Sequence, residues 1–143
     1  MIFPDVNLLL YAYNTESAAY KKAAAWLQGV MNSNERLCHS WHTIMGFIRI
    51  STNSRIFPKP YSAKEALEIV SSLINAKNST MLLPGSGHFA VFEKLVNEAG
   101  INGPKLMDAH IAALAIEHGA TLASADRDFR LFDGLKIINP LTS

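Results

Sequence analysis

The segment 106–129 restricts the possible folds of this chain more than any other stretch of the sequence. It begins as an apolar helix that ends at Gly119, and a short apolar strand follows at once. Asp108 lies in the first turn of this helix, and Asp126 and Asp128 come just after the strand. In an α/β protein, groups beyond the carboxyl ends of the strands line the crevice where ligands bind. The segment therefore predicts an acidic site at one edge of a sheet.

Short apolar runs alternate with helical patterns along the rest of the chain. This alternation is typical of an α/β fold, in which helices cover both faces of a parallel sheet. No internal repeat, low-complexity segment or linker interrupts it. We expect strands over residues 1–4, 36–39, 80–83, 120–123 and 135–138, and helices over residues 6–13, 18–31, 41–51, 63–75, 88–99 and 106–118.

Helix starts are marked by side chains that accept hydrogen bonds from the free N–H groups of the first turn. Ser62, followed three positions later by Glu65, has the pattern of a capping box. The other expected N-caps are Asp5, Ser17, Ser40 and Ser86.

Composition predicts one folded domain over residues 1–143, because 49% of the residues are apolar and only 17% are charged. The net charge of +1 indicates no strong preference for polyanions. Cys38 is the only cysteine, so an internal disulfide is impossible, which suits a reducing compartment. The sequence has neither a signal-peptide pattern nor an apolar run of membrane-spanning length. We therefore expect a cytoplasmic location.

Four of the five aspartates are expected at strand ends or at the start of a helix that faces them. Besides the three already named, Asp5 follows the first apolar run. Carboxylates that meet at one edge repel one another unless a cation lies between them, and Mg²⁺ prefers oxygen ligands. A purely structural reading stays open, because aspartate is also favoured in caps and turns.

The histidines and glycine-rich segments give weaker signals. His110 lies about 200° round its helix from Asp108, so the two side chains face different ways. The sequence Gly85-Ser86-Gly87 lacks the lysine of a phosphate-binding loop, and no serine nucleophile elbow is present. A phosphoacceptor signalling domain is disfavoured, because no strand-end aspartate in mid-chain is paired with a later lysine. We expect structural roles for His39, His42, His88, His110 and His118.

Three segments of the chain carry motifs in a fixed order. Residues 1–12 combine an apolar run, an acid and an apolar helical segment; residues 106–115 read Leu-Met-Asp-Ala-His-Ile-Ala-Ala-Leu-Ala; and residues 122–129 read Leu-Ala-Ser-Ala-Asp-Arg-Asp-Phe. They resemble three motifs of the PIN-domain nucleases, and among these the VapC toxins of toxin–antitoxin systems: the opening strand with the first acid and first helix, the "D-A-x-I-A-A-x-A" helix, and the "T-x-D-x-D-F" motif, with Ser124 in the threonine position. The resemblance implies a three-layer α/β/α sandwich with a mostly parallel central sheet. It also implies a Mg²⁺ (or Mn²⁺) site and endoribonuclease activity on RNA, with tRNA or ribosomal RNA as the expected target.

The resemblance further implies a cognate VapB-like antitoxin and a homodimer. Four apolar side chains of the first two helices are expected to be partly exposed in a monomer and to suit an interface, namely Leu9, Tyr13, Trp26 and Leu27.

By this resemblance the catalytic residues are Asp5, Asp108, Asp126 and Asp128. The first three are expected to hold one metal ion, and Asp128 to reach it directly or through water. Cleavage is then expected to leave a 3′-hydroxyl and a 5′-phosphate. The candidates for contacts with substrate are Asn7, Arg49, Ser124 and Arg127, with Arg55 and Lys59 as further basic residues.

One position departs from the family pattern. Gly46 stands where the third helix of the family usually carries a glutamate, in the context Ser40-Trp41-His42-Thr43-Ile44-Met45-Gly46. One carboxylate fewer is expected to weaken cation binding. The alternative is therefore a catalytically impaired PIN-like domain that binds RNA or an antitoxin, and metal-dependent cleavage that needs Asp108 distinguishes the two.

Overall fold

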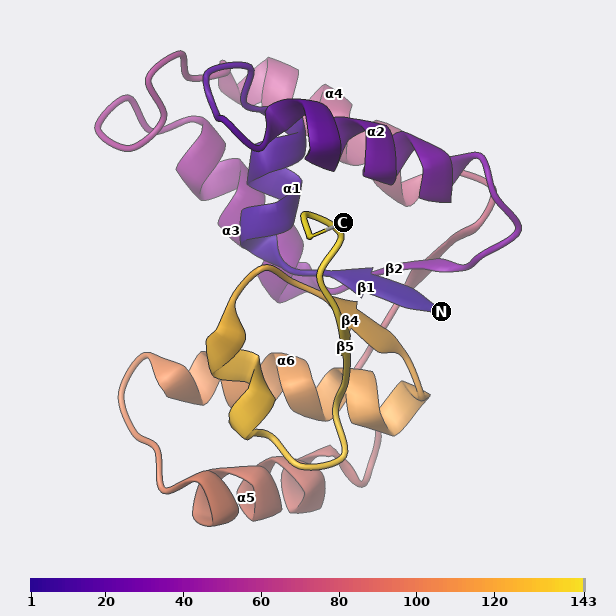
Figure 1. The fold of residues 1–143 in the computed structure, drawn as a ribbon, viewed down its shortest axis with the longest axis vertical. Helices are drawn as coiled ribbons and strands as arrows, with labels where there is room; N and C mark the ends of the chain where they lie inside the picture. Colours follow the sequence, from indigo (N-terminus) through magenta and orange to yellow (C-terminus); the bar gives the residue numbers. More distant parts are fainter. Residues whose placement is uncertain (143) are drawn as a thin grey trace.

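The computed structural model describes residues 1–142, which form a five-stranded, all-parallel sheet with helices on both faces (Figure 1). The strand order is β3-β2-β1-β4-β5, so the first strand of the chain is the central one. This arrangement confirms the predicted α/β/α architecture. The strands are β1 (Ile2–Pro4), β2 (Leu37–His39), β3 (Ser79–Met81), β4 (Thr121–Ala123) and β5 (Lys136–Ile138); the helices are α1 (Val6–Tyr13), α2 (Tyr20–Met31), α3 (Trp41–Ser51), α4 (Ala63–Ile74), α5 (His88–Ala99), α6 (Lys105–His118) and the 3₁₀ helix η1 (Arg127–Leu131).

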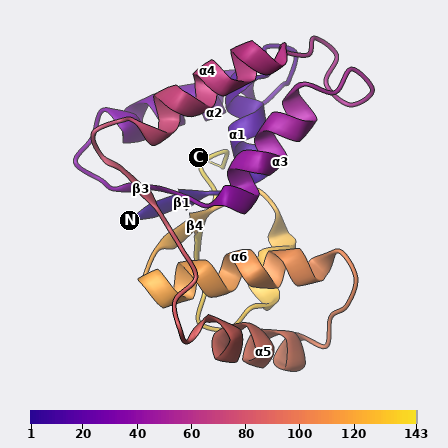
Figure 2. The same cartoon turned by 180° about the vertical axis from the view of Figure 1, so that it is seen from behind.

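The helices divide unequally between the two faces. Helices α1 to α4 cover one face of the sheet, and α5 and α6 cover the other, as the two opposite views show (Figures 1 and 2). Successive strand residues point to opposite faces: Phe3 and Leu122 belong to the core beneath α6, whereas Ala123 belongs to the core beneath α1. The three central strands β2, β1 and β4 are largely buried, as expected for strands covered on both faces, whereas the edge strands β3 and β5 are more exposed.

Helix α6 is apolar on nearly all sides because it lies between the sheet and α5. Ala109, Ala112 and Ala113 are completely buried in this layer. The helix ends at Gly119, whose φ of 67° is the left-handed conformation that glycine adopts most easily. Its first turn, with Asp108, therefore comes to lie at the carboxyl edge of the sheet.

Three of the predicted caps are confirmed. Asp5, Ser40 and Ser62 each accept a hydrogen bond from the first turn of the helix that follows. The prediction for Ser17 was wrong, because its hydroxyl accepts from the Ala19 N–H (3.1 Å) in a turn and α2 begins only at Tyr20.

The prediction for Ser86 was also wrong. Gly87 occupies the N-cap of α5, and no side chain caps that helix. The expected exposure of Leu9 and Leu27 was wrong as well: these side chains are 1% and 3% exposed, because α1 and α2 pack their apolar faces against each other. Tyr13 and Trp26 are half-buried. None of the helices in residues 1–142 is long and apolar enough to span a membrane.

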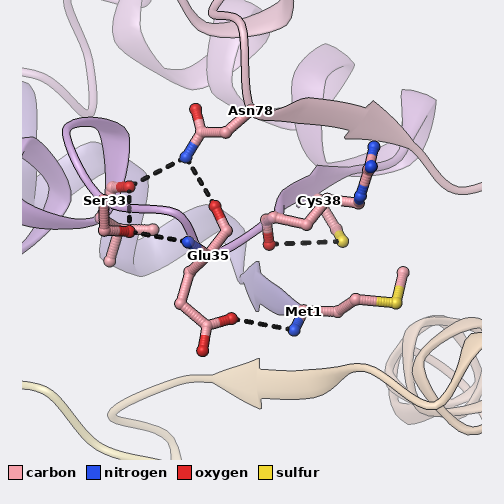
Figure 3. Close-up of polar contacts among 7 residues, drawn as sticks. Met1, Ser33, Glu35, Cys38 and Asn78 are labelled. Atoms are coloured by element: carbon pink, nitrogen blue, oxygen red, sulfur yellow. Dashed lines mark hydrogen bonds and ion pairs between the residues drawn. The ribbon is translucent and has the colours of Figure 1, made fainter.

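A group of polar contacts fastens the amino ends of three strands (Figure 3). The Asn78 side chain, just before β3, donates to the backbone carbonyls of Val30 (2.9 Å) and Glu35 (2.6 Å). The Glu35 carboxylate, just before β2, pairs with the amino group of Met1 at 3.1 Å. These contacts hold the amino edge of the sheet together and leave the opposite edge to the acidic side chains.

Candidate active site

A cleft of about 90 Å³ opens at the carboxyl edge of the sheet, beyond β1 and β4. The strand order reverses here, because the chain runs from β1 to one side through β2 and β3 and then returns to the other side with β4. Such switch points are where open α/β sheets bind ligands. The lining residues are Asp5, Val6, Asn7, His42, Thr43, Asp108, Ile111, Asp126 and Phe129.

Asp5 follows β1 directly and is the deepest of the acids, with only 6% of its surface exposed. One carboxylate oxygen accepts from the Leu8 N–H at 2.8 Å, and the other accepts from the Ser124 hydroxyl. Burial raises the pKa of Asp5, the two hydrogen bonds lower it, and the charge of Asp126 raises it again. Asp5 is thus both the predicted helix cap and a carboxylate of the cleft, and one role does not exclude the other.

Asp126 follows β4 and begins η1. Its backbone N–H donates to the Ser124 hydroxyl at 3.0 Å, and its Oδ1 accepts from the Asp128 N–H at 2.9 Å. The Asp128 side chain is exposed and is not among the lining residues, and its Oδ2 lies 3.9 Å from Nζ of Lys105. Asp126 therefore belongs to the cleft, whereas Asp128 lies outside its lining.

Asp108 reaches the cleft from the first turn of α6. Burial raises the pKa of its carboxyl, and the negative charges of Asp126, Asp128 and Asp5 raise it further, in that order. Lys105 acts in the opposite direction and lowers it. Four acids that come from three parts of the chain thus share one electrostatic environment. The basic residue Lys105 was not among the sequence-based candidates, although it stands one turn before Asp108.

The donor set of this cleft fits a hard divalent cation. Three carboxylates and the amide side chain of Asn7 offer oxygen ligands. The carboxylates repel one another at Asp108, and a bound cation would neutralise their negative charge. Within residues 1–142, no group of three acidic, histidine or cysteine side chains is already arranged to hold an ion. Asp5, Asp108 and Asp126 are the carboxylates of the cleft that would hold such an ion.

Helix α3 forms the opposite wall, and here Gly46 packs against α1. A Cβ atom at this position would lie 3.1 Å and 3.4 Å from the two methyl groups of Val6. Val6 itself lines the cleft. The position of the missing glutamate is therefore adjacent to the site, but Val6 fills the space that a side chain would need. His42, one turn earlier on α3, also lines the cleft.

The sequence patterns did not predict a row of contacting side chains that leads from His42 away from the cleft. The ring centroids of His42 and His110 are 6.1 Å apart, and His110 Nδ1 lies 2.9 Å from His88 Nε2. The Nδ1 of His88 in turn pairs with the Glu117 carboxylate, whose other oxygen accepts from the Gly85 N–H at 3.0 Å. Burial lowers the pKa of both His42 and His110, and neighbouring positive charge lowers each further.

The only sign of this row of side chains in the sequence is the spacing of His110 and Glu117. These residues stand seven positions apart, two turns of one helix face. His42 and His88 come from other elements, and linear spacing does not reveal them.

The predicted substrate contacts lie in different settings. Asn7 is exposed at the cleft, and Arg49 is exposed on α3, where its charge lowers the pKa of His42. Arg127 is exposed beside the cleft and lines a small neighbouring hollow. Ser124 is 2% exposed and bonded to Asp5, so it orients that carboxylate. Lys59 pairs with Glu16 at 2.9 Å, outside the cleft lining.

The comparisons with known proteins cover nearly the whole chain. The family model described as the PIN domain matches residues 2–135. Ribonuclease VapC43 of Mycobacterium tuberculosis is 36% identical over 141 residues, which cover 99% of this chain and 96% of that protein. Ribonuclease VapC37 of the same organism is 32% identical over 136 residues, which cover 95% of this chain and 94% of that protein.

A solved structure repeats the fold. A chain of a toxin–antitoxin complex from Klebsiella pneumoniae matches with a TM-score of 0.65 and 17% identity, covering 98% of each chain. At that identity the match concerns the fold alone. The family model extends over the strands and helices that carry every acid of the cleft. The chain therefore belongs to the PIN-domain family and, within it, to the VapC ribonucleases.

Proposed function

We propose that this chain acts as one PIN domain and as a metal-dependent endoribonuclease toxin. Its substrate is RNA, with tRNA or ribosomal RNA as the expected target, and its cofactor is Mg²⁺ or Mn²⁺. The observation that carries the proposal is the convergence of Asp5, Asp108 and Asp126 on one cleft at the switch point of the sheet. The curated relatives VapC43 and VapC37 are named ribonucleases, which supports the same activity here.

Each acid has a role that follows from its surroundings. Asp5 is held rigid by two hydrogen bonds, so it fixes the position of the ion. Asp108 and Asp126 complete the ligand set, and Asp128 acts from outside the lining, directly or through water. When bound, the divalent ion supplies the Lewis acidity that activates a water molecule and neutralises the phosphate.

Side chains around the cleft position the RNA. Asn7 is exposed and carries an amide that can donate to a phosphate oxygen. Arg49 and Arg127 are exposed basic residues near the cleft, and Lys105 stands before Asp108 on the same helix. Such contacts fix the register of a nucleic acid without reading its sequence.

The family supports three further proposals. We propose that a cognate VapB-like antitoxin binds the protein and blocks cleavage, because a structural neighbour is a toxin–antitoxin complex. We propose a homodimer as the active form and the cytoplasm as its location.

The first experiment is cleavage of total tRNA and of ribosomal RNA by the purified, antitoxin-free protein. Reactions contain Mg²⁺, Mn²⁺ or EDTA, and the Asp108→Asn variant runs beside the wild type. We expect discrete fragments with 5′-phosphate ends that require both the metal and Asp108. Circular dichroism of the variant shows whether it keeps the fold of the wild type.

The competing function is an impaired domain that binds RNA or the antitoxin without cutting. Gly46 in place of an acid favours it, since the cleft has one carboxylate fewer to hold an ion. Absence of cleavage by a folded wild type with either metal would establish this alternative and reject the enzyme. Cleavage that persists in Asp108→Asn would reject the assignment of the cleft instead.

A further inference from the structure

A shallow groove of about 340 Å³ lies between α5 and α6, next to the acidic cleft. Its volume is within the range of small-molecule sites in proteins. The rings of His88 and Phe92 line it and are nearly parallel, with centroids 6.4 Å apart and an angle of 18° between the planes. Leu106, Met107 and His110 complete the lining. The groove thus offers apolar and aromatic surface with a histidine at its border.

The hydrogen bonds behind the groove determine which nitrogen of His110 is left for a ligand. Glu117 pairs with His88 Nδ1, so Nε2 is the nitrogen of His88 that faces His110. Nδ1 of His110 lies 2.9 Å from it and is engaged in that contact. The remaining nitrogen, Nε2 of His110, makes no hydrogen bond within residues 1–142 and is left for a ligand.

The groove and the cleft are served by the same two turns of α6. Asp108 and Ile111 line the cleft, whereas Met107 and His110 line the groove. The His110 ring also approaches His42, which belongs to the cleft wall, edge to face. A polymer with a phosphate in the cleft therefore has its neighbouring group beside the groove.

We propose that this groove holds one unstacked nucleobase next to the cleaved phosphate, with His110 Nε2 forming a hydrogen bond to the edge of the base. This inference rests on the proposed ribonuclease function and names the form of substrate that the site takes. Proteins that read single-stranded RNA stack bases on aromatic side chains and bond to the base edges. An aromatic wall, an apolar floor and one ring nitrogen without a hydrogen-bond partner within residues 1–142, all beside the acidic cleft, provide both kinds of contact.

The test uses a short RNA that the wild type cuts at one bond. An abasic ribose replaces the nucleotide on either side of that bond, one position at a time. We expect one abasic position to lower kcat/KM of the wild type roughly 10- to 100-fold, the usual effect of losing a stacked base. Met107→Ala removes part of the groove floor at a side chain that is 45% exposed, so the fold should tolerate it.

Two variants of the histidine separate its contacts. His110→Asn keeps a polar side chain near His88 but places no nitrogen at the Nε2 position, whereas His110→Ala removes both contacts. We expect Met107→Ala, His110→Asn and His110→Ala to cut the intact RNA more slowly than the wild type does. In these variants, replacing the base by an abasic ribose should lower kcat/KM less than about threefold. Leu67→Ala is the matched control, because Leu67 is 55% exposed on α4 and does not line the groove. It should behave like the wild type on every RNA.

Binding is measured separately, so that failure of catalysis and failure of the groove are distinguishable. Fluorescence anisotropy in EDTA follows a 2′-O-methyl RNA of the same sequence, which does not have to be cut. Weaker binding by Met107→Ala and His110→Asn, and no loss with Leu67→Ala, would support the groove even if no RNA is ever cleaved. Equal binding and equal abasic penalties in all proteins would overturn the inference. If the groove variants lose antitoxin binding but still lose as much kcat/KM on abasic RNA as the wild type does, the groove binds a protein and the inference is wrong.

Discussion

The hydroxyl of Ser124 donates a hydrogen bond to Oδ2 of Asp5, although the two residues are 119 positions apart in the sequence. The same hydroxyl accepts from the backbone N–H of Asp126 at 3.0 Å. One buried oxygen therefore links the carboxylate that follows β1 to the acidic segment that follows β4. The two sides of the switch point are held together by this contact as well as by the strand ladder.

The first prediction concerns this link. Ser124→Ala leaves Oδ2 of Asp5 buried without a donor, and the pKa of Asp5, already raised by burial, should rise further. We expect a loss of roughly 10- to 100-fold in metal affinity, the usual cost of removing an outer partner of a ligand. Metal titration and the pH profile of cleavage measure it. Ser124→Thr keeps the hydroxyl and should rescue both, and an unchanged titration in Ser124→Ala would contradict the role.

The second prediction concerns Gly46. Gly46→Glu restores the carboxylate that is usual in the family, but its Cβ would lie 3.1 Å from a Val6 methyl group. Val6 is β-branched and cannot easily rotate away inside a helix. We expect a loss of about 1–3 kcal/mol in the free energy of unfolding, the usual cost of overpacking.

The double variant Gly46→Glu, Val6→Ala makes room for the new side chain. It should recover stability and bind Mg²⁺ more tightly than Val6→Ala alone, which is the matched control. Urea unfolding and calorimetric metal titration give the two quantities. If the double variant binds the ion no better, position 46 does not face the ligand set.

The third prediction concerns charge repulsion at Asp108. The pKa of this carboxyl in the folded protein is raised, so the proton stabilises the folded state at low pH, and that stabilisation is lost as the pH rises through the folded pKa. Asp108→Asn removes the charge. We therefore expect its Tm in EDTA at pH 7 to exceed that of the wild type by a few degrees. Below about pH 3.8, where the wild-type carboxyl is protonated in both states, the difference should vanish.

With Mg²⁺ present, the wild type should have the higher Tm of the two proteins, because the ion stabilises only the protein that can bind it. Scanning calorimetry with and without the ion provides the comparison. A lower Tm for Asp108→Asn in EDTA would mean that the contacts of the Asp108 carboxylate stabilise the fold more than its charge repulsion destabilises it.

The fourth prediction concerns His39, which is 1% exposed and whose pKa is lowered by burial to about 4. The unfolded chain, with a value near 6.5, binds a proton that the folded state rejects. Stability is therefore complete above pH 6.5 and falls as the pH drops toward 4. Between pH 7 and pH 4.5 this single group should cost about 2.5 kcal/mol.

His39→Leu cannot titrate, so its loss of unfolding free energy over the same pH interval should be smaller by that amount. Urea unfolding at the two pH values measures the difference. Parallel losses in the two proteins would show that other groups cause the acid sensitivity.

The sequence was sufficient to predict the fold and the acidic cleft for one physical reason. Parallel strands end at the same edge of the sheet, so acids that follow different strands meet there without any information on side-chain packing. Asp5 and Asp126 follow strands β1 and β4, and Asp108 begins the helix that returns to that edge. Asp128 also follows β4, but it lies within η1, is exposed and is not among the residues that line the cleft.

The remaining features depend on packing between elements, which residue spacing along the sequence does not reveal. The contact between Gly46 and Val6 joins α3 to α1, and the pair formed by His88 and His110 joins α5 to α6. The helix η1 has only five residues and no periodic pattern to reveal it. Ser86 was expected to cap α5 because serine suits both turns and caps, and the local sequence does not distinguish them.

The central position of β1 has a consequence for the order in which the cleft is assembled during synthesis. β1 pairs with β2 on one side and with the much later strand β4 on the other. Asp5 is synthesised 119 positions before Ser124, the residue that bonds to its carboxylate. A nascent chain that has not yet reached Asp126 therefore carries no assembled cleft, and nuclease activity has to wait for β4.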